Sequence, residues 1–242
     1  MNRPALSIAT SFDYDIPFEE QVPAIATAGF SHVSLGGWTE HSGYLTASGQ
    51  KHIKNLVRHN GLEIDTLHAP CSMELPDSVQ RLTTAARAAA GLEIPVVVIH
   101  VGPFEIEASN QTDLLARILA TGRELEVVSR KTGVVFAIEN LLPGPATDLS
   151  LAVGSELDPA CFGFCYDSSH DQIDDPNSFD LLTHFGGRLF AVHLSDRIAE
   201  FVDHVPPGEG FIDWNGLTRA LGQAGYDNPL LFEVYTTHSS IK

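Results

Sequence analysis

The chain has 242 residues, of which 43% are hydrophobic, so it can bury a substantial core. Its formal net charge of −17 at pH 7 repels nucleic acid phosphates and anionic membrane surfaces at long range, so we expect neither as a partner. No apolar run reaches the roughly 18 residues of a membrane span, and the N-terminus shows no signal-peptide pattern, so we expect a cytoplasmic location. The three cysteines, Cys71, Cys161 and Cys165, do not form the pattern of a disulfide framework.

The first half of the chain alternates short β-branched runs with stretches of helical period. Strands are expected at 5–10, 31–35, 62–68 and 95–100. Helices are expected between them, at 17–30, through Ile53 and Val57 up to the Asn60–Gly61 pair, and at 76–91. The run "PVVVIH" is continuously apolar before its histidine, as is typical of a parallel strand buried on both faces.

The same unit recurs in the second half. Strands are expected at 133–140, 161–167, 188–194 and 229–235. Helices are expected at 112–131 and 148–156, from a cap at Asp175–Pro176 through Leu182, and around Trp214 to Leu221. A loop of about 18 residues separates the seventh strand from the last of these helices.

Eight strands with helices between them predict a parallel α/β sheet. For a chain of this length without a break in composition, we expect a closed (β/α)8 TIM barrel that occupies residues 1–242 as a single domain. Only seven residues follow Tyr235, so the usual final helix is expected to be missing or vestigial. A doubly wound open sheet is the alternative, but no Gly-rich phosphate turn follows the first strand.

Six successive strands end in a potential metal ligand. These residues are His68, His100, Glu139, Asp167, His193 and Glu233. The carboxyl ends of barrel strands meet at one rim, where the active sites of such barrels lie. Gathered carboxylates would repel one another and buried imidazoles would lose hydration, and a divalent cation relieves both costs. The alternative is an ion-pair network, but the strand ends contain no basic residue to complete it.

Two further histidines follow these strands. His170 lies one short turn past Asp167, so it is expected to bind the same ion, a neighbouring ion or a substrate oxygen, although Asp167 and Ser168 could also simply cap that turn. His204 lies in the loop "DHVPPGEGFIDW", whose prolines and glycines suit a lid or a preformed ligand arm, or else a plain exposed loop.

An ordered set of motifs between about residues 62 and 235 resembles a known family. The motifs are "LHAP", "VVIHVG", "IEN", "CYDSSH", "VHLSD", "HVPPGEGFIDW" and "FEVY". They are similar to those of the xylose isomerase-like TIM-barrel superfamily, which includes sugar-phosphate and ketose isomerases and epimerases and the apurinic/apyrimidinic endonucleases of family 2 type. The motif set is specific for the superfamily but does not select a member.

The resemblance implies roles for individual residues. In the epimerases, the residues that match Glu139, Asp167, His193 and Glu233 hold one divalent ion, commonly manganese, magnesium or cobalt, and the two glutamates also move protons. His170 matches a histidine that contacts the substrate. In the endonucleases, the same four belong to a zinc cluster, with His68 and His100 matching ligands of a second zinc and His170 and His204 matching ligands of a third.

The chain departs from the family pattern at two positions. Val202 stands where the endonuclease loop has an aspartate, because Asp203 is directly next to His204. Ala199 stands where the epimerases have a substrate-binding arginine, and Arg197 is the nearest replacement.

Three functions remain open at this stage. The favoured one is a metal-dependent isomerase or epimerase of a small sugar, sugar phosphate or hydroxy-carbonyl compound, in which Glu139 and Glu233 transfer protons through a metal-stabilised enediolate. Phe12 and Trp38 would wall its pocket. The alternative is a multinuclear zinc phosphodiester hydrolase, and the third is a metal-binding barrel without turnover. The oligomeric state is open at this stage: a missing last helix would leave an apolar strip for a second subunit, which would allow a homodimer.

Overall fold

Eight parallel strands form the centre of the protein. The computed structural model describes residues 4–104, 106, 111–173, 178–199 and 202–236. The strands are β1 (Leu6–Ala9), β2 (His32–Leu35), β3 (Glu63–His68), β4 (Val96–Ile99), β5 (Val135–Glu139), β6 (Phe162–Asp167), β7 (Leu189–His193) and β8 (Leu230–Phe232). Each lies within the range that the sequence predicts, although β8 ends three residues early.

The strands follow one another around a nearly closed barrel. Their order in the sheet is β7-β6-β5-β4-β3-β2-β1-β8, with every pair parallel. Leu194, just past β7, closes the ring: its N–H donates to Leu231 O at 2.8 Å and its carbonyl accepts from Glu233 N at 3.1 Å. The (β/α)8 TIM barrel expected from the sequence is therefore confirmed, and the open doubly wound sheet is wrong.

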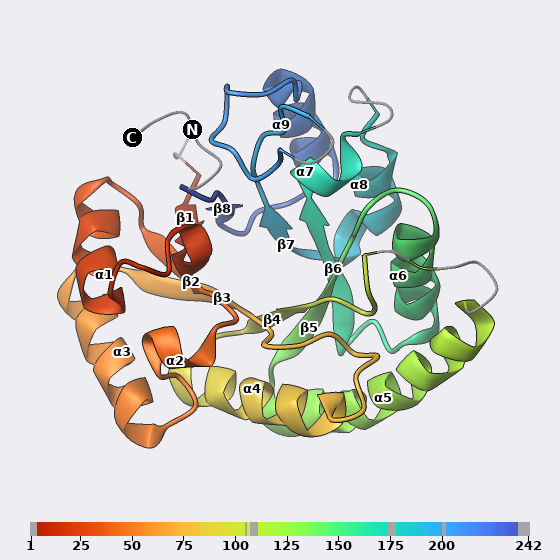
Figure 1. Cartoon of the computed structure of the whole chain (residues 1–242), viewed down its shortest axis with the longest axis horizontal. Coiled ribbons are helices and arrows are strands. Elements are labelled where there is room, and N and C mark those ends of the chain that lie inside the picture. The colour runs from red at the N-terminus through yellow and green to blue at the C-terminus, as the bar shows by residue number, and fades with distance from the viewer. Residues whose placement is uncertain (1–3, 105, 107–110, 174–177, 200–201, 237–242) are drawn as a thin grey trace.

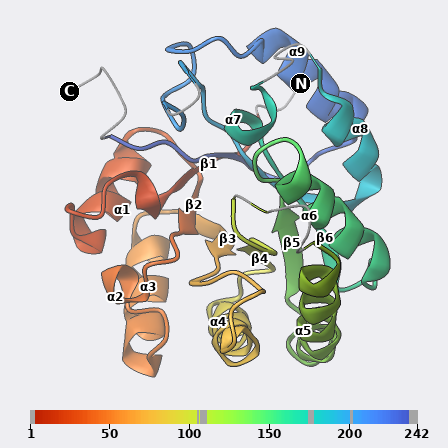
Figure 2. The ribbon, with the colours of Figure 1, turned by 45° about the vertical axis from the view of Figure 1, so that its right-hand side comes forward.

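Helices cover the outer side of the strands (Figures 1 and 2). The main ones are α1 (Phe18–Thr27), α3 (Ala47–His59), α4 (Ser78–Leu92), α5 (Gln111–Thr132), α6 (Pro145–Glu156), α8 (Asp180–Phe185) and α9 (Trp214–Gln223). Short elements are η1 (Thr10–Phe12), α2 (Thr39–Ser42), α7 (Ser168–Asp171) and η3 (Gly186–Arg188). No helix in the described part of the chain is both long enough and apolar enough to cross a membrane.

The helices of the structure depart from the expected ones in part. The expected start at Asp175–Pro176 lies outside the described residues, and α8 begins only at Asp180. The sequence missed α2 and α7, because each has only four residues and no apolar period. Between β8 and Thr236 the described chain contains no helix, and the expected absence of a final helix otherwise falls on 237–242, outside the described residues.

Side-chain alternation separates two apolar cores. The larger lies between sheet and helices and includes Val97, Ile99, Phe136 and Ile138. The smaller fills the barrel and consists of Val96, Val98, Ala137, Cys165 and Ala191, with Val135 and Phe190 against it. Because successive side chains of a strand point to opposite faces, residues two positions past an interior one also face the barrel axis. Glu139, Asp167 and His193 stand in this relation to Ala137, Cys165 and Ala191.

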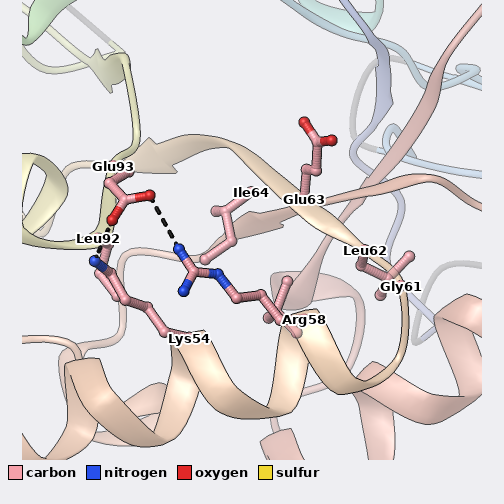
Figure 3. Close-up of a pocket in the computed structure, with 9 residues that line it drawn as sticks. Lys54, Arg58, Gly61, Leu62, Glu63, Ile64, Leu92 and Glu93 are labelled. Atoms are coloured by element: carbon pink, nitrogen blue, oxygen red, sulfur yellow. Dashed lines mark hydrogen bonds and ion pairs between the residues drawn. The ribbon is translucent and has the colours of Figure 1, made fainter.

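A surface pocket of about 490 Å³ lies where α3, the start of β3 and the end of α4 meet (Figure 3). Lys54 and Arg58 on α3 both pair with Glu93, at 2.6 and 3.1 Å. Glu63 and Ile64, which also line it, begin β3, so the pocket is at the opposite end of that strand from His68. Lys54, Arg58 and Glu93 pair with one another there, so none of these three charges is left to bind a ligand.

Candidate metal centre

The carboxyl ends of the strands bring a cluster of buried acids and imidazoles together. One ligand atom from each of Glu139, Asp167, His193 and Glu233 lies within 4.8 Å of the others, and all four residues are buried. His68, His100, His170 and His204 belong to adjoining groups of the same kind: His68, His100 and Glu139 in one, and Asp167, His170 and His204 in another. The structure therefore brings together all eight residues that the sequence selected as ligands.

Glu139, at the end of β5, is the centre of the cluster. Its Oε2 lies 3.2 Å from His100 Nε2, 3.2 Å from His193 Nδ1 and 3.4 Å from His68 Nε2. These imidazoles come from β7 and from the ends of β3 and β4, so one carboxylate oxygen meets three strands. A buried carboxylate needs such partners, because an isolated charge is costly to remove from water.

Asp167 both caps a helix and faces the cluster. Its Oδ1 accepts from Ser169 N at 2.7 Å, Ser169 Oγ at 2.8 Å and His170 N at 2.9 Å, which caps α7. Its Oδ2 is buried without a hydrogen-bond partner and lies 3.6 Å from His204 Nε2. Asp167 can therefore cap α7 and act as a candidate metal ligand at the same time, because Oδ1 does the first and Oδ2 is available for the second.

Asn140 aligns Asp167 with β5, and the sequence analysis did not select it as a site residue. Its side chain accepts from Asp167 N at 2.8 Å and donates to Asp167 O at 3.0 Å, extending the sheet ladder by one step. Its own carbonyl lies 3.0 Å from His170 Nδ1. The available signal was its position directly after Glu139 in "IEN", at the end of a strand.

His193 and Glu233 complete the four-residue group. His193 Nδ1 is 2.9 Å from Glu233 Oε2 as well as 3.2 Å from Glu139 Oε2, so it lies between the two glutamates. Glu233 follows β8 directly, and its N–H bonds to Leu194 O, the carbonyl next to His193. Closure of the barrel between β7 and β8 therefore positions this pair.

The cluster balances its own charge through strongly shifted pKa values. Burial by itself would raise the pKa of Glu139, but His193 and His100 outweigh it and hold that pKa well below its usual range. Burial would lower the pKa of His193, but Cys165, Glu233 and Glu139 raise it well above its usual value. The pKa of His204 rises to about 11 against the effect of burial, through Asp167 and Asp203. These shifts favour protonated imidazoles beside ionised carboxylates in the metal-free protein, and a bound cation would compete with those protons.

The donor set fits a divalent ion. Three carboxylates and an imidazole are ligands that manganese, magnesium, cobalt and zinc accept in proteins. Asp167 Oδ2 and His193 Nδ1 are buried without an aligned hydrogen bond. Asp167 Oδ2 has a lone pair to offer directly, and His193 Nδ1 would offer one once a bound ion displaces its proton. Glu139, Asp167, His193 and Glu233 are thus the residues that would hold one ion, and the two histidine-rich groups beside them could hold others.

A pocket of about 480 Å³ opens beside the cluster. It is lined by Ser11, Tyr14, Gly36, Gly37, His68, His100, Phe104, Glu233 and Tyr235. Three aromatic rings, Tyr14, Phe104 and Tyr235, form walls that the sequence prediction missed, although each follows the end of a strand. Gly37 is required at this wall, because a Cβ there would lie 2.8 Å from Ala69 O.

None of the four residues expected to bind substrate is among those that line this pocket. Phe12 packs against the main core, and Trp38 is 50% exposed with its ring against Tyr14, so neither is among the pocket-lining residues. Arg197 is fully buried and donates to backbone carbonyls instead. His170 is also buried, with its ring edge-on to Phe104 at 5.4 Å. A substrate contact by any of these four residues stays a prediction.

These features define a parallel (β/α)8 barrel whose candidate site lies at the carboxyl ends of its strands. Residues 22–241 match the family model described as the xylose isomerase-like TIM barrel, and the chain belongs to this family. The resemblance inferred from the motifs is confirmed.

Known relatives agree with the family but do not name a reaction for this chain. An uncharacterized protein of Sinorhizobium fredii, y4fM, is 26% identical over 91% of this chain and 82% of its own length. A D-tagatose 3-epimerase-like protein superposes with a TM-score of 0.80 at 18% identity, over 96% of this chain and 90% of that one. The Escherichia coli 3-keto-D-glucoside 4-epimerase gives 0.78 at 16% identity, over 96% and 92%. An AP endonuclease of family 2 from Brucella melitensis gives 0.75 at 18%, over 96% and 93%.

Proposed function

We propose that the protein is a metal-dependent isomerase or epimerase of a small sugar or hydroxy-carbonyl compound. The observation that supports this function best is the pair of buried glutamates, Glu139 and Glu233, on either side of His193 in one four-residue group. Epimerisation next to a carbonyl needs one group to remove a proton and another to return it, and two carboxylates beside a cation suit that task.

The chain's own residues would do most of the work. When bound, the divalent ion supplies positive charge beside the substrate's carbonyl and hydroxyl oxygens. Glu139 and Glu233 would exchange a proton with the carbon next to the carbonyl, one as base and the other as acid. Glu233 lines the pocket and Glu139 lies behind it, against His68 and His100, which also line it. Tyr14, Phe104 and Tyr235 would exclude water from the reacting carbon.

The size and lining of the pocket favour a single sugar as the substrate. A cavity of about 480 Å³ falls within the range of small-molecule sites, which is about 300–1,000 Å³. Its aromatic walls and its rim of imidazole, hydroxyl and carboxylate groups match the apolar faces and hydroxyl groups of a carbohydrate. The charge of −17 opposes nucleic acid as a partner.

A multinuclear zinc hydrolase is the second candidate, and the extra histidines support it. His68 and His100 adjoin Glu139, and His170 and His204 adjoin Asp167, so three ions could be held side by side. Clustered zinc lowers the pKa of bound water to about 7 and clamps phosphate oxygens.

Metal counting and isotope exchange test the two functions. We expect one ion per chain, exchangeable with manganese, and solvent deuterium at the carbon next to the carbonyl when ketoses are incubated with the loaded protein in D2O. Two or three tightly held zinc ions with cleavage of abasic DNA or a phosphodiester would favour the hydrolase. Exchange into no ketose, aldose or phosphorylated sugar, despite full metal loading, would reject the isomerase.

A further inference from the structure

Arg197 is a fully buried arginine that the proposed reaction does not use. All three of its guanidinium nitrogens donate to protein oxygens: Nε to Ser169 O at 2.6 Å, Nη1 to Ala199 O at 3.1 Å and Nη2 to Asp203 Oδ2 at 2.9 Å. Its exposed fraction is 0%. Removing a guanidinium from water costs free energy, and these three contacts offset that cost. Moving the arginine would break them, so the contacts hold its side chain in this position.

The contacts of Arg197 join two segments that both carry candidate metal ligands. Ser169 belongs to α7, and its N–H and hydroxyl both donate to Asp167 Oδ1. Asp203 belongs to the loop after β7, and its Oδ1 lies 3.2 Å from His204 Nδ1, an ion-pair contact that is not aligned as a hydrogen bond. The guanidinium therefore fixes the distance between the segment with Asp167 and His170 and the segment with His204.

His204 needs such support, because its backbone is strained. Its backbone φ of 52° lies in the left-handed region, which residues other than glycine rarely adopt. Its ring stacks on Tyr235 at 4.6 Å, and its carbonyl accepts from Tyr235 N at 2.8 Å. Its Nε2 then faces the cluster, 3.6 Å from Asp167 Oδ2 and 3.8 Å from Glu233 Oε2.

We propose that Asp203 and Arg197 are positioning residues, which hold His204 with its Nε2 toward Asp167 and His170. A carboxylate at one ring nitrogen of a histidine fixes the ring's rotation and directs the other nitrogen at a metal. Here the carboxylate comes from the neighbouring residue, and Arg197 keeps it from turning to solvent. The inference rests on the Asp167, His170 and His204 group, which adjoins the four residues that would hold the ion of the proposed function, and not on the reaction. It gives Arg197 a structural contact in place of the substrate contact expected from the sequence.

The test combines zinc binding with the NMR signals of the His204 ring. Zinc affinity and stoichiometry are measured by chelator competition for the wild type, Asp203→Asn and Arg197→Met. The ring signals are recorded on the same proteins with 15N-labelled histidine, and the signal that His204→Ala removes is assigned to His204. We expect both variants to weaken zinc binding at the sites that include His204 about 10- to 100-fold. Arg197→Lys, which keeps a cation there, should recover part of the loss.

The matched control is Arg188→Met. Arg188 also donates to two backbone carbonyls, Gly154 O at 2.8 Å and Phe162 O at 2.9 Å, but it precedes β7 and so lies at the other end of the barrel. This variant should lose stability while leaving the His204 signals and zinc affinity within about twofold, since it touches no candidate ligand.

Three results would separate the possibilities. Asp203→Asn and His204→Ala combined should weaken zinc binding no more than His204→Ala alone, and additive losses would overturn the proposal. Unchanged His204 ring signals in both Asp203→Asn and Arg197→Met would also overturn it, whether zinc is present or not. A wild type that binds no metal would reject the metal centre, and one that binds zinc only at the four-residue group would reject zinc binding by His204. In both cases the ring signals of the metal-free protein would still decide whether Asp203 and Arg197 hold the His204 ring.

Discussion

Replacing Asp196 with alanine should destabilise the long loop between β7 and α9. The side chain is fully buried, and its carboxylate accepts four hydrogen bonds. Oδ1 accepts from Arg197 N at 2.9 Å and Ile212 N at 3.1 Å, and Oδ2 accepts from Gly208 N and Trp214 Nε1, both at 2.9 Å. One carboxylate therefore ties both ends and the middle of the loop to the end of the barrel.

The size of the effect follows from the burial of the four donors. Gly208 is exposed, so water can replace the lost acceptor there, whereas Arg197 and Ile212 are buried and the indole is half-buried. A buried donor without an acceptor costs about 1–3 kcal/mol, so we expect Asp196→Ala to lower the free energy of unfolding by about 3–5 kcal/mol. Asp196→Asn should cost nearly as much, because its amide would face two donors.

Urea unfolding followed by tryptophan fluorescence measures this change. The chain has only Trp38 and Trp214, and Trp214 reports directly on the loop. Asp158→Ala is the control: Asp158 also accepts from a backbone N–H and an arginine, but at the surface, so its removal should cost far less. A loss below about 1 kcal/mol for Asp196→Ala, at an unchanged denaturant slope, would refute the reasoning.

The stability that Asp196 contributes should also depend on pH. Burial by itself would raise the pKa of Asp196, but its bonds from Trp214, Ile212, Arg197 and Gly208 hold it below the usual value. A depressed folded pKa contributes stability that is fully present above the unfolded pKa of about 3.9 and is lost as the pH falls through the folded pKa. The difference in stability between the wild type and Asp196→Asn should therefore shrink below about pH 4.

Three further predictions concern the metal centre. Glu139→Gln should reduce deuterium exchange into substrate at least about 100-fold, because it removes both a proton carrier and a ligand, and residual exchange near the wild-type rate would contradict the assignment. His100→Ala should change turnover less than about tenfold for a one-ion isomerase, since His100 lies outside the four-residue group; loss of both metal and turnover would point to several ions. Metal affinity measured by calorimetry should rise with pH, by up to about tenfold per pH unit for each proton displaced. The reason is that the pKa of His193 is raised well above its usual value and that of His204 to about 11 in the metal-free protein, so a metal ion must displace protons from these rings. A metal affinity that does not change between pH 6 and pH 8 would show that metal binding displaces no proton.

Local sequence pattern was enough for the strands and for the choice of candidate ligands at their ends. The unbroken apolar run Val96–Ile99 identifies a strand covered on both faces, and alternation within the strands places Glu139, Asp167 and His193 inside the barrel. Both signals depend on neighbours within a few positions, so they can be read from one segment at a time. The strand ends then converge because parallel strands in a barrel share one rim.

Other features depended on segments far apart in the chain. The pocket walls Tyr14, Phe104 and Tyr235 come from three loops that no local period links. The exposed position of Trp38 and the core packing of Phe12 follow from neighbours that the sequence does not identify.

The sequence by itself determined the class of barrel and which acids and imidazoles meet at its rim. Only the tertiary structure decided how each atom is used: one oxygen of Asp167 caps α7 while the other faces the cluster, and Arg197 turns into the protein toward Ser169. The physical reason is that secondary structure and side-chain alternation arise from local backbone geometry. The partner of a buried polar atom is instead set by which segments barrel closure brings within hydrogen-bonding distance.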